Sequence, residues 1–335
     1  MQFLVIQTAF IGDVVLATGI IEKLHRHFPE AQIDFMVRKG NEGLLKDHPF
    51  LREVLVWDKT SGQKYKSLRS LLQRIRSRKY DKLINVQRFA ATGLLTAFSG
   101  ARETIGFDKN PFSRFFTKRI KHIISDGANT RHEIERNNEL IKDFTGEEIM
   151  KPRLYPSPAD EAVAQQYQQV PYITISRASV WFTKMYPADK WIGFLKKLSP
   201  AHTVYLLGGP GDAALAESIR QGAPHLTVTN LCGKLNFLQS TALMRKAMMN
   251  YVNDSAPMHF ASAVNAPVTA IYCSTLPSFG FGPLSDKRFI VEIEEPLPCR
   301  PCGLHGRKTC PLGHFKCAYN IKEEQLLEVI AERGS

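Results

Sequence analysis

Short apolar runs alternate with longer amphipathic segments through the first 90 residues. The apolar runs lie at Phe3–Gln7, Ile33–Val37, Glu53–Val56 and Lys82–Val86, and helical periodicity is found at Val14–Phe28 and Tyr65–Arg78. This alternation is typical of a parallel sheet whose strands are joined by crossover helices. The sequence therefore predicts an α/β fold.

A proline-rich segment, Lys151–Pro158, interrupts this alternation, which then resumes. The later apolar runs lie at Tyr172–Ser176, Thr203–Leu207, Tyr251–Val252 and Val268–Tyr272, with helical segments after Pro187, within Asp212–Gln221 and from Ser255. A chain of 335 residues exceeds the size at which one hydrophobic core usually keeps growing. We predict two α/β domains, at 1–153 and 154–320. A C-terminal helix within 321–335 could pack on either domain, and we expect it to pack back on the N-terminal one.

The N-terminus reads as a buried strand followed by a helix. It lacks a basic region and a small-residue cleavage site, and Asp13 interrupts its apolar run. No stretch of the sequence approaches the 18 or so uninterrupted apolar residues of a membrane span. We expect a cytoplasmic protein.

The chain carries a net charge of +12, from 44 Lys and Arg against 32 Asp and Glu. This excess favours anionic partners, namely nucleotides, phospholipid surfaces or nucleic acid. Much of it lies in Lys64–Lys82, where Leu68, Leu71, Leu72 and Ile75 recur at helical spacing beneath a basic face. That face is either solvated or a contact with an acidic membrane surface.

Gly12 and Asp13 lie where the first strand meets its helix, a position at which open α/β sheets bind ligands. Only Gly12 and Gly19 are present, so the three-glycine fingerprint of a dinucleotide site is missing and NAD binding is disfavoured. Asp13 has two interpretations, an N-cap of the helix or a general base. A base would have to escape the pKa-lowering effect of the helix N-terminus.

Two further loops carry groups suited to binding a phosphate. Ser179, Thr183 and Lys184 lie between a strand and a helix that begins after Pro187, where a lysine can neutralise a diphosphate and hydroxyls can add hydrogen bonds. Gly208 and Gly209 form a strand-to-helix turn in which small residues let a ligand approach the backbone. A surface lysine and ordinary turn chemistry are the structural alternatives.

Asn250–Phe260 passes directly from a strand end into a helix, with Asp254 or Ser255 as its cap. The first amides of this helix, including that of Ala256, and its positive dipole end suit a diphosphate. His259, one turn further on, either faces a ligand or packs against the sheet.

Four cysteines gather near the C-terminus, at Cys299, Cys302, Cys310 and Cys317, together with His305 and His314. Thiolates and histidines are ligands for tetrahedral zinc, but only the first pair has the two-residue gap of a zinc ribbon. We favour reduced cysteines in a loop-rich element over a structural metal, and a disulfide is disfavoured in the cytosol.

Taken in order along the chain, these segments resemble glycosyltransferase family 9, the ADP-heptose:lipopolysaccharide heptosyltransferases. The matching pieces are IGDVVLATGII, HEIERNNEL at His132–Leu140, ASVWFTKMYP, LLGGPGD, NLCGKLNFLQSTALMRKA, NDSAPMHFASAVNAPVTAIY, FGP at Phe281–Pro283 and CRPCGLHGRKTCPLGHFKC. Each piece is weak alone, and their combination and order are specific.

The resemblance implies a GT-B architecture, with two Rossmann-like domains facing a central cleft, the first binding the acceptor and the second the donor nucleotide. It implies an inverting, metal-independent transfer of a heptose or related sugar from an ADP-sugar to a lipopolysaccharide-core acceptor, with no cofactor and no nucleic acid, at or near the cytoplasmic face of the inner membrane. Asp13 matches the proposed general base, Lys184 a phosphate contact, and Asp254 the motif that meets sugar and diphosphate near the amides of Ser255 and Ala256. His132 and Arg136 match a helical pair to which the resemblance assigns no role.

Two departures from the family pattern bear on the donor. Ser176 and Arg177 stand where a small pair such as Pro-Gly is usual, and Ala256 stands where Gly is common. Arg177 either adds a phosphate or acceptor contact or narrows the pocket. The alternatives from other classes are an NAD-dependent oxidoreductase or epimerase and a basic nucleic-acid-binding protein with a cysteine-rich metal site.

Overall fold

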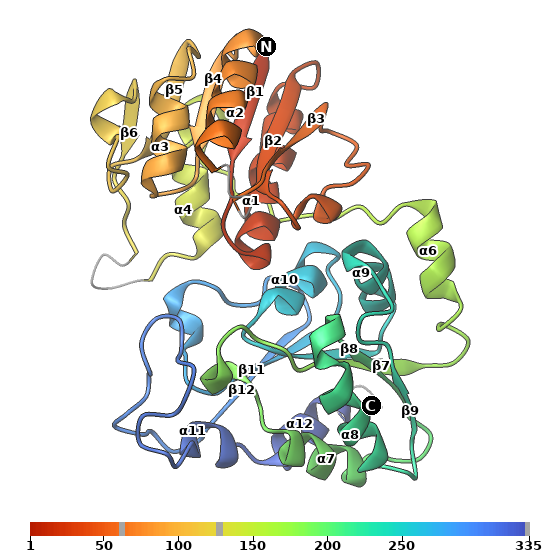
Figure 1. The fold of residues 1–335 in the computed structure, drawn as a ribbon. Coiled ribbons are helices and arrows are strands. Elements are labelled where there is room, and N and C mark those ends of the chain that lie inside the picture. The colour runs from red at the N-terminus through yellow and green to blue at the C-terminus, as the bar shows by residue number, and fades with distance from the viewer. Residues whose placement is uncertain (60–63, 125–129, 332–335) are drawn as a thin grey trace. The chain divides into compact units, whose positions relative to one another are not determined.

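A computed structural model describes residues 1–59, 64–124 and 130–331 of the chain. It divides into two compact units, Met1–Tyr155 and Pro156–Ser335 (Figure 1). The boundary falls within the proline-rich segment Lys151–Pro158, which interrupts the alternation of strands and helices in the sequence.

The described part of the first unit contains a six-stranded parallel sheet in the order β3-β2-β1-β4-β5-β6. Its strands are β1 (Gln2–Ile6), β2 (Gln32–Arg38), β3 (Glu53–Trp57), β4 (Lys82–Asn85), β5 (Glu103–Phe107) and β6 (Lys118–Ile120). Its helices are α1 (Ile11–His27), α2 (Lys64–Arg78), α3 (Ala90–Ala97), α4 (Glu133–Glu139) and α5 (Lys142–Thr145), with 3₁₀ turns at Glu42–Leu44 and Ser113–Phe115.

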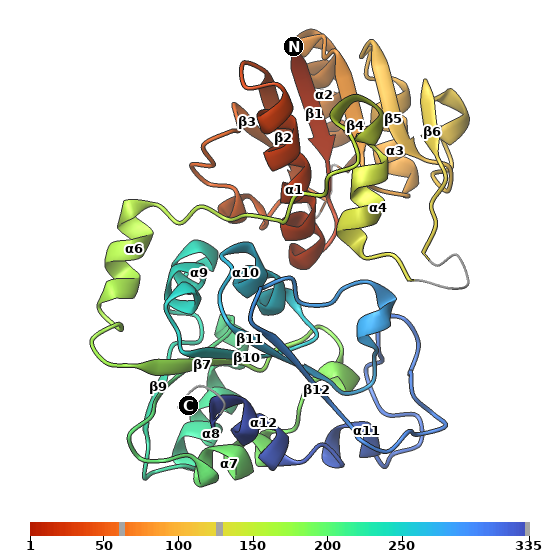
Figure 2. The ribbon, with the colours of Figure 1, turned by 180° about the vertical axis from the view of Figure 1, so that it is seen from behind.

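Helices cover both faces of this sheet. Figure 1 shows α2 and α3 on one face, and the reverse view in Figure 2 shows α1 and α4 on the other. Leu71 and Ile75 of α2 are buried against Leu4 and Ile6 of β1, with Leu68 and Leu72 packed at the edge of the cluster. The apolar face predicted for this basic helix is thus confirmed as part of the core.

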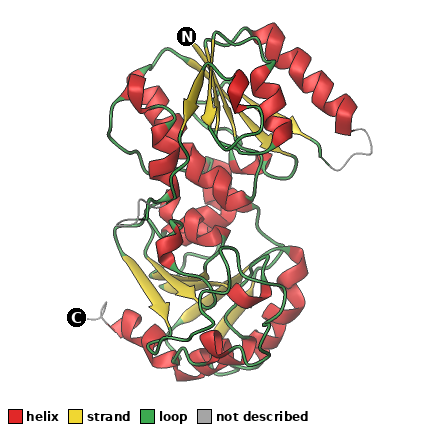
Figure 3. Ribbon diagram, turned by 90° about the vertical axis from the view of Figure 1, so that its left-hand side faces the viewer, coloured by secondary structure: helices red, strands yellow, loops and turns green. Residues whose placement is uncertain are grey.

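The described part of the second unit repeats the plan, with a parallel sheet in the order β12-β11-β10-β7-β8-β9. Its strands are β7 (Tyr172–Ser176), β8 (Thr203–Leu207), β9 (Thr227–Asn230), β10 (Met249–Asn253), β11 (Val268–Tyr272) and β12 (Arg288–Glu292). Its helices are α6 (Pro158–Gln165), α7 (Ala188–Lys197), α8 (Ala213–Gln221), α9 (Phe237–Arg245), α10 (Ala256–Ala263), α11 (Lys316–Tyr319) and α12 (Glu323–Ala331), with 3₁₀ turns at Phe182–Lys184, Pro210–Asp212 and Pro277–Phe279. Figure 3 shows the strands of each unit flanked by helices.

The C-terminal helix α12 belongs to the second unit. It packs on α7 and β12, and the hydroxyl of Tyr251 in β10 donates a hydrogen bond of 2.8 Å to the carbonyl oxygen of Leu326. Leu326 is fully buried in the core of this unit. The expectation that this helix packs on the N-terminal domain is therefore wrong. Residues 332–335 of the predicted segment lie outside the described residues.

Strand order reverses once in each sheet, between β1 and β4 and between β7 and β10. This is the arrangement of Rossmann-like domains, and ligands of open α/β sheets bind at the carboxyl ends of the strands beside such a reversal. The prediction of two Rossmann-like α/β domains is confirmed. Within the described residues, no helix combines the length and the apolar character that a membrane span requires.

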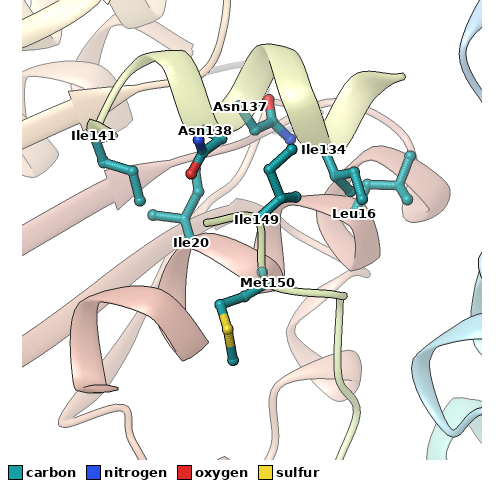
Figure 4. A pocket seen from close by; sticks show the side chains of 9 residues that line it. Leu16, Ile20, Ile134, Asn137, Asn138, Ile141, Ile149 and Met150 are labelled. Atoms are coloured by element: carbon teal, nitrogen blue, oxygen red, sulfur yellow. The ribbon is translucent and has the colours of Figure 1, made fainter. Parts of the chain in front are cut away.

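Helices α1 and α4 pack closely on one face of the first sheet. Leu16 and Ile20 of α1 face Ile134 of α4 and Ile141 at the N-cap of α5, around a cavity of about 10 Å³ that also borders Gly19 (Figure 4). A cavity of this size holds at most about one water molecule. The absence of a side chain at Gly19 lets the chain segment that follows α5 lie directly against α1.

We predict that Gly19→Ala destabilises the protein by about 1–3 kcal/mol although Ala is the better helix former. A β-carbon at this position would lie 2.6 Å from the carbonyl oxygen of Met150, a backbone atom that cannot rotate away. Gly193→Ala on α7 is the control, because its nearest neighbour is a side-chain oxygen of Glu323 at 3.2 Å. Thermal unfolding should show a clear loss for the first variant and a change within about 1 kcal/mol for the second; equal effects would contradict the prediction.

Candidate active site

Asp13 follows the central strand β1 and lies in the first turn of α1. The helix begins at Ile11, three residues before the predicted start, and Phe10 occupies the N-cap position. Asp13 is therefore the third helical residue, and the N-cap interpretation is wrong. Its Oδ2 accepts a hydrogen bond of 3.1 Å from the backbone nitrogen of Phe10, so this carboxylate still closes the helix end.

The loop between β1 and α1 is fixed at the point where the strand order reverses. Thr8, after β1, donates a hydrogen bond of 2.6 Å from its hydroxyl to the Gln87 side chain, which follows β4. Asn41 donates to the carbonyl oxygen of Ala9 at 3.0 Å. The backbone that carries Asp13 is thereby held from both neighbouring strands.

The Asp13 carboxyl lies in an environment that favours its protonated form. Burial raises its pKa to about 6, and the nearby charge of Glu133 acts in the same direction. The hydrogen bond from Phe10 and the charge of Arg38 oppose this shift but do not cancel it. A carboxylate with a pKa near neutrality is a better proton acceptor than an ordinary Asp.

Arg136 holds Glu133 in place on α4. Its Nε and Nη2 donate to the same carboxylate oxygen at 2.8 and 2.5 Å, and its Nη1 donates to the carbonyl oxygen of Arg131. His132 is the N-cap of this helix and accepts a hydrogen bond of 3.3 Å from the backbone nitrogen of Ile134. The pair His132 and Arg136 therefore organises the helix that presents Glu133 to Asp13.

In the second unit, Lys184 and Asp254 come together although 70 positions separate them in the chain. Lys184 Nζ lies 2.7 Å from Asp254 Oδ2, with the two side chains 15% and 10% exposed. The Thr275 hydroxyl donates a further hydrogen bond of 2.6 Å to the same oxygen. Lys184 is thus a largely buried partner of Asp254, and the surface interpretation of this lysine is wrong.

Asn253, the last residue of β10, fixes the loop that carries Lys184. Its Nδ2 donates to the carbonyl oxygen of Arg177, and its Oδ1 accepts a hydrogen bond of 3.1 Å from the backbone nitrogen of Tyr186. Both ends of the loop after β7 are thereby tied to the neighbouring strand.

Thr183 and Ser179, which were predicted to contact the donor, make hydrogen bonds that hold this loop in place. Thr183 is buried, and its Oγ1 accepts hydrogen bonds from the Ser274 hydroxyl at 3.0 Å and from the Arg307 backbone nitrogen at 2.8 Å. Ser179 accepts a hydrogen bond of 3.4 Å from the backbone nitrogen of Trp181. The geometry favours a supporting role for Thr183 over contact with a ligand.

Helix α10 begins with Ser255 at its N-cap position, and Ser255 and Ala256 are partly exposed. Asp254 does not cap the helix, since its carboxylate binds Lys184 and Thr275 instead. The accessible first turn combines backbone amides with the positive end of the helix dipole, as an anion site requires. His259 lies one turn further along and is buried, which fits packing against the sheet.

Gly208 and Gly209 form the predicted turn between β8 and the following helix. The backbone nitrogen of Gly209 donates a hydrogen bond of 2.9 Å to Asp212. A β-carbon on Gly208 would lie about 3 Å from both Asp212 and Cys232. Turn chemistry accounts for both glycines, and Asp212 and Cys232 flank the first of them.

The cysteine-rich segment, residues 299–317, supports the loops around Lys184 and Asp254. Arg300 donates to the carbonyl oxygens of Cys273 and Thr275 at 2.8 and 2.9 Å, and the Cys302 nitrogen donates to that of Ser274 at 2.8 Å. The backbone of Arg307 makes two hydrogen bonds with Thr183. Its carbonyl oxygen accepts one from the Thr183 backbone nitrogen, and its backbone nitrogen donates the other to the Thr183 hydroxyl.

All six cysteines are free thiols. Cys299 Sγ lies 4.0 Å from His314 Nε2. Within the described ranges, no group of three or more His, Cys, Asp or Glu side chains is arranged to hold a metal ion.

The strand reversals define a two-domain Rossmann-like α/β protein, with an acidic group after β1 and an accessible helix start after β10. The sequence pattern of glycosyltransferase family 9 (heptosyltransferase) matches residues 68–312. The chain belongs to this family and is a glycosyltransferase.

Individual relatives agree with this assignment. Lipopolysaccharide heptosyltransferase 3 of Escherichia coli is 25% identical over 280 residues, which cover 79% of this chain and 82% of that protein. Lipopolysaccharide heptosyltransferase 1 of Pseudomonas aeruginosa is 23% identical over 347 residues, covering 98% and 93%. The solved structure of E. coli ADP-heptose lps heptosyltransferase II superposes with a TM-score of 0.80 at 20% identity and covers 100% of both chains, so the fold is shared.

We predict that Thr275→Val destabilises the second unit by about 1–2 kcal/mol, because Val keeps the shape of Thr but removes a hydrogen bond to a buried carboxylate. Urea unfolding followed by tryptophan fluorescence, to which Trp181 and Trp191 of the second unit contribute beside Trp57 of the first, would measure the change. Thr275→Ser keeps the hydroxyl and is the matched control; a Val variant as stable as the Ser variant would contradict the role given to this contact.

Proposed function

We propose that this protein transfers a heptose or a related sugar from an ADP-sugar to a lipopolysaccharide-core acceptor, with inversion at the anomeric carbon and without a catalytic metal. Membership of family 9 and two relatives described as lipopolysaccharide heptosyltransferases support the sugar and the acceptor. A solved relative described as an ADP-heptose enzyme supports the donor. The first unit binds the acceptor and the second the donor.

The observation that carries the mechanism is the Asp13 carboxyl, with its pKa raised to about 6 at the carboxyl end of β1. In this mechanism the acceptor hydroxyl oxygen forms a bond to the anomeric carbon while the bond from that carbon to the phosphate oxygen breaks. Asp13 receives the hydroxyl proton, and the nucleoside diphosphate leaves with the electron pair of the broken bond. At pH 7 most Asp13 side chains are ionised and ready for this role.

Charge on the departing diphosphate is stabilised by groups of the second unit. Lys184 supplies a cation, and the first turn of α10 supplies amides and the positive dipole end near Ser255 and Ala256. Asp254 contacts the sugar and sets the position of Lys184. These groups take the part that a divalent ion has in metal-dependent transferases.

We further propose that the enzyme works at the cytoplasmic face of the inner membrane. The net charge of +12 supports an attraction to anionic lipid, and α2 exposes Lys66, Arg69 and Arg76. Arg74 and Arg78 of the same helix pair with Glu53 and add less to this attraction.

A donor screen tests the proposed function. Purified protein is incubated with ADP-heptose, ADP-glucose, UDP-glucose and GDP-mannose, each with a lipopolysaccharide-core acceptor, and the products are weighed by mass spectrometry. We expect addition of one heptose from ADP-heptose, at a rate that EDTA leaves largely unchanged. Turnover that EDTA abolishes and magnesium or manganese restores would refute the metal independence, and transfer from a UDP-sugar or GDP-sugar alone would refute the donor.

We predict that Asp13→Asn lowers single-turnover transfer by about 10²- to 10⁴-fold while donor affinity stays near wild type, because the amide can accept the Phe10 hydrogen bond but not a proton. In the wild type, kcat/KM should fall as the pH drops below about 6, where Asp13 becomes protonated. An Asn variant that keeps normal transfer would remove Asp13 as the base.

The same variant reports on stability, with a sign that follows from the raised pKa. Above pH 6 the folded wild type holds an ionised Asp13 in an environment that disfavours the charge. In the unfolded chain Asp13 has an ordinary pKa of 3.8 and is ionised in water at no such cost. Asp13→Asn should therefore melt at a higher temperature than wild type at pH 8, and the difference should shrink as the pH falls from 6 toward 4. A lower melting temperature at pH 8 would contradict the assigned shift.

A further inference from the structure

Arg177 is a buried cation at the carboxyl end of the central strand β7. Its side chain is 8% exposed, and among the described residues its Nε has no hydrogen-bond partner. Its Nη2 makes a weak contact of 3.4 Å with the sulfur of Met185. Arginine stays charged in proteins, so the second unit holds a largely dry guanidinium with donors still to be satisfied.

The surroundings of this guanidinium do not supply a paired carboxylate. Burial lowers the pKa of Arg177, and the charge of Asp212 acts in the opposite direction without forming an ion pair. The Asp212 carboxylate is instead engaged by the backbone nitrogen of Gly209. A buried cation in this state lowers stability, and an anionic ligand would relieve that cost.

The position of Arg177 lies beside the reversal of strand order. Its carbonyl oxygen accepts a hydrogen bond from Asn253 at the end of β10, which fixes the backbone on one side. On the other side its guanidinium interacts with Asp212 and Cys232, the two residues that flank Gly208. The side chain therefore extends from β7 toward the glycine turn after β8, where a nucleotide can approach the backbone.

Charge balance separates this residue from Lys184. Asp254, at 2.7 Å, offsets part of the charge that Lys184 presents to a ligand. The dipole of α10 adds only about half a positive charge. A bound diphosphate carries more negative charge than this, and Arg177 is an adjacent cation without such compensation.

We propose that Arg177 binds the diphosphate of the nucleotide donor. The guanidinium is present where the family usually has a small residue, and it makes the affinity of this enzyme for its nucleotide depend more strongly on the charge of the phosphates. The inference rests on the proposed function of the second unit. A guanidinium suits this ligand because its planar donors match two phosphate oxygens at once.

Calorimetric titration of wild type, Arg177→Met and Arg177→Lys tests the proposal. Wild type is first titrated with ADP, UDP and GDP, and the tightest of the three is then compared with its uncharged nucleoside in all three proteins. We expect Arg177→Met to bind the diphosphate about 10- to 100-fold more weakly, the loss of a charge-assisted contact, and the nucleoside within about threefold of wild type. Arg177→Lys should show a smaller loss, again confined to the diphosphate.

Thermal unfolding separates this role from a structural one. Met has a similar length and removes an uncompensated charge, so the ligand-free Met variant should melt no lower than wild type. Should the Met variant fail to fold, the Lys variant tests the role of Arg177, because its affinities for the diphosphate and the nucleoside can be compared in the same way.

Unchanged diphosphate affinity, or equal losses for diphosphate and nucleoside, would overturn the role of Arg177 and leave the proposed function standing. A wild-type protein that binds none of the three nucleotides would overturn both.

Discussion

The reversal of strand order at the centre of each sheet is the constraint on which the rest of the molecule depends. Connections on the two sides of a reversal run in opposite directions, so the carboxyl ends of β1 and β4, and of β7 and β10, lie side by side without a crossover above them. Asp13 follows β1, Lys184 follows β7 and Asp254 follows β10. Two parallel sheets thus place groups far apart in the chain where one ligand in each unit can meet them.

Charged side chains in both units are held by neighbours from other elements. Asp13 lies near a like charge, Glu133, and Arg136 keeps that carboxylate in place. Lys184 and Asp254 form the opposite arrangement, a largely buried pair anchored by Thr275. The first arrangement shifts the proton equilibrium of Asp13 at some loss of stability, and the second fixes the position of the Lys184 ammonium group. Both depend on a neighbour contributed by another element.

The periodicity of the sequence predicted two α/β domains and the strands β1 to β4, β7, β8, β10 and β11, because burial on a sheet or a helix face repeats with the backbone geometry. It did not predict β5, β6, β9 or β12, and the Rossmann-like architecture was an implication of the family resemblance. It misplaced the start of α1, since Asp13 closes that helix from its third position through Phe10 rather than as the cap. Local motifs also contained Lys184 and Asp254, but Glu133, Thr275 and Arg300 were missed. Their roles arise from contacts between segments about 20 to 120 residues apart, for which a single sequence carries no periodic signal. The unusual Arg177, in contrast, was visible as a departure from the family pattern.

The hydrogen bonds between Thr183 and Arg307 join residues 124 positions apart, so the loop that carries Lys184 takes its final form late during synthesis. The first unit ends at Tyr155 and has its whole sheet available while the ribosome is still extending the second. The loop that carries Lys184 emerges early in the second unit, yet its support from Arg307 emerges near the end of translation. A nascent chain that stops before the cysteine-rich segment would contain Asp13, Lys184 and Asp254 but would lack the hydrogen bonds between Thr183 and Arg307. The final form of the Lys184 loop is therefore one of the last properties the growing polypeptide acquires.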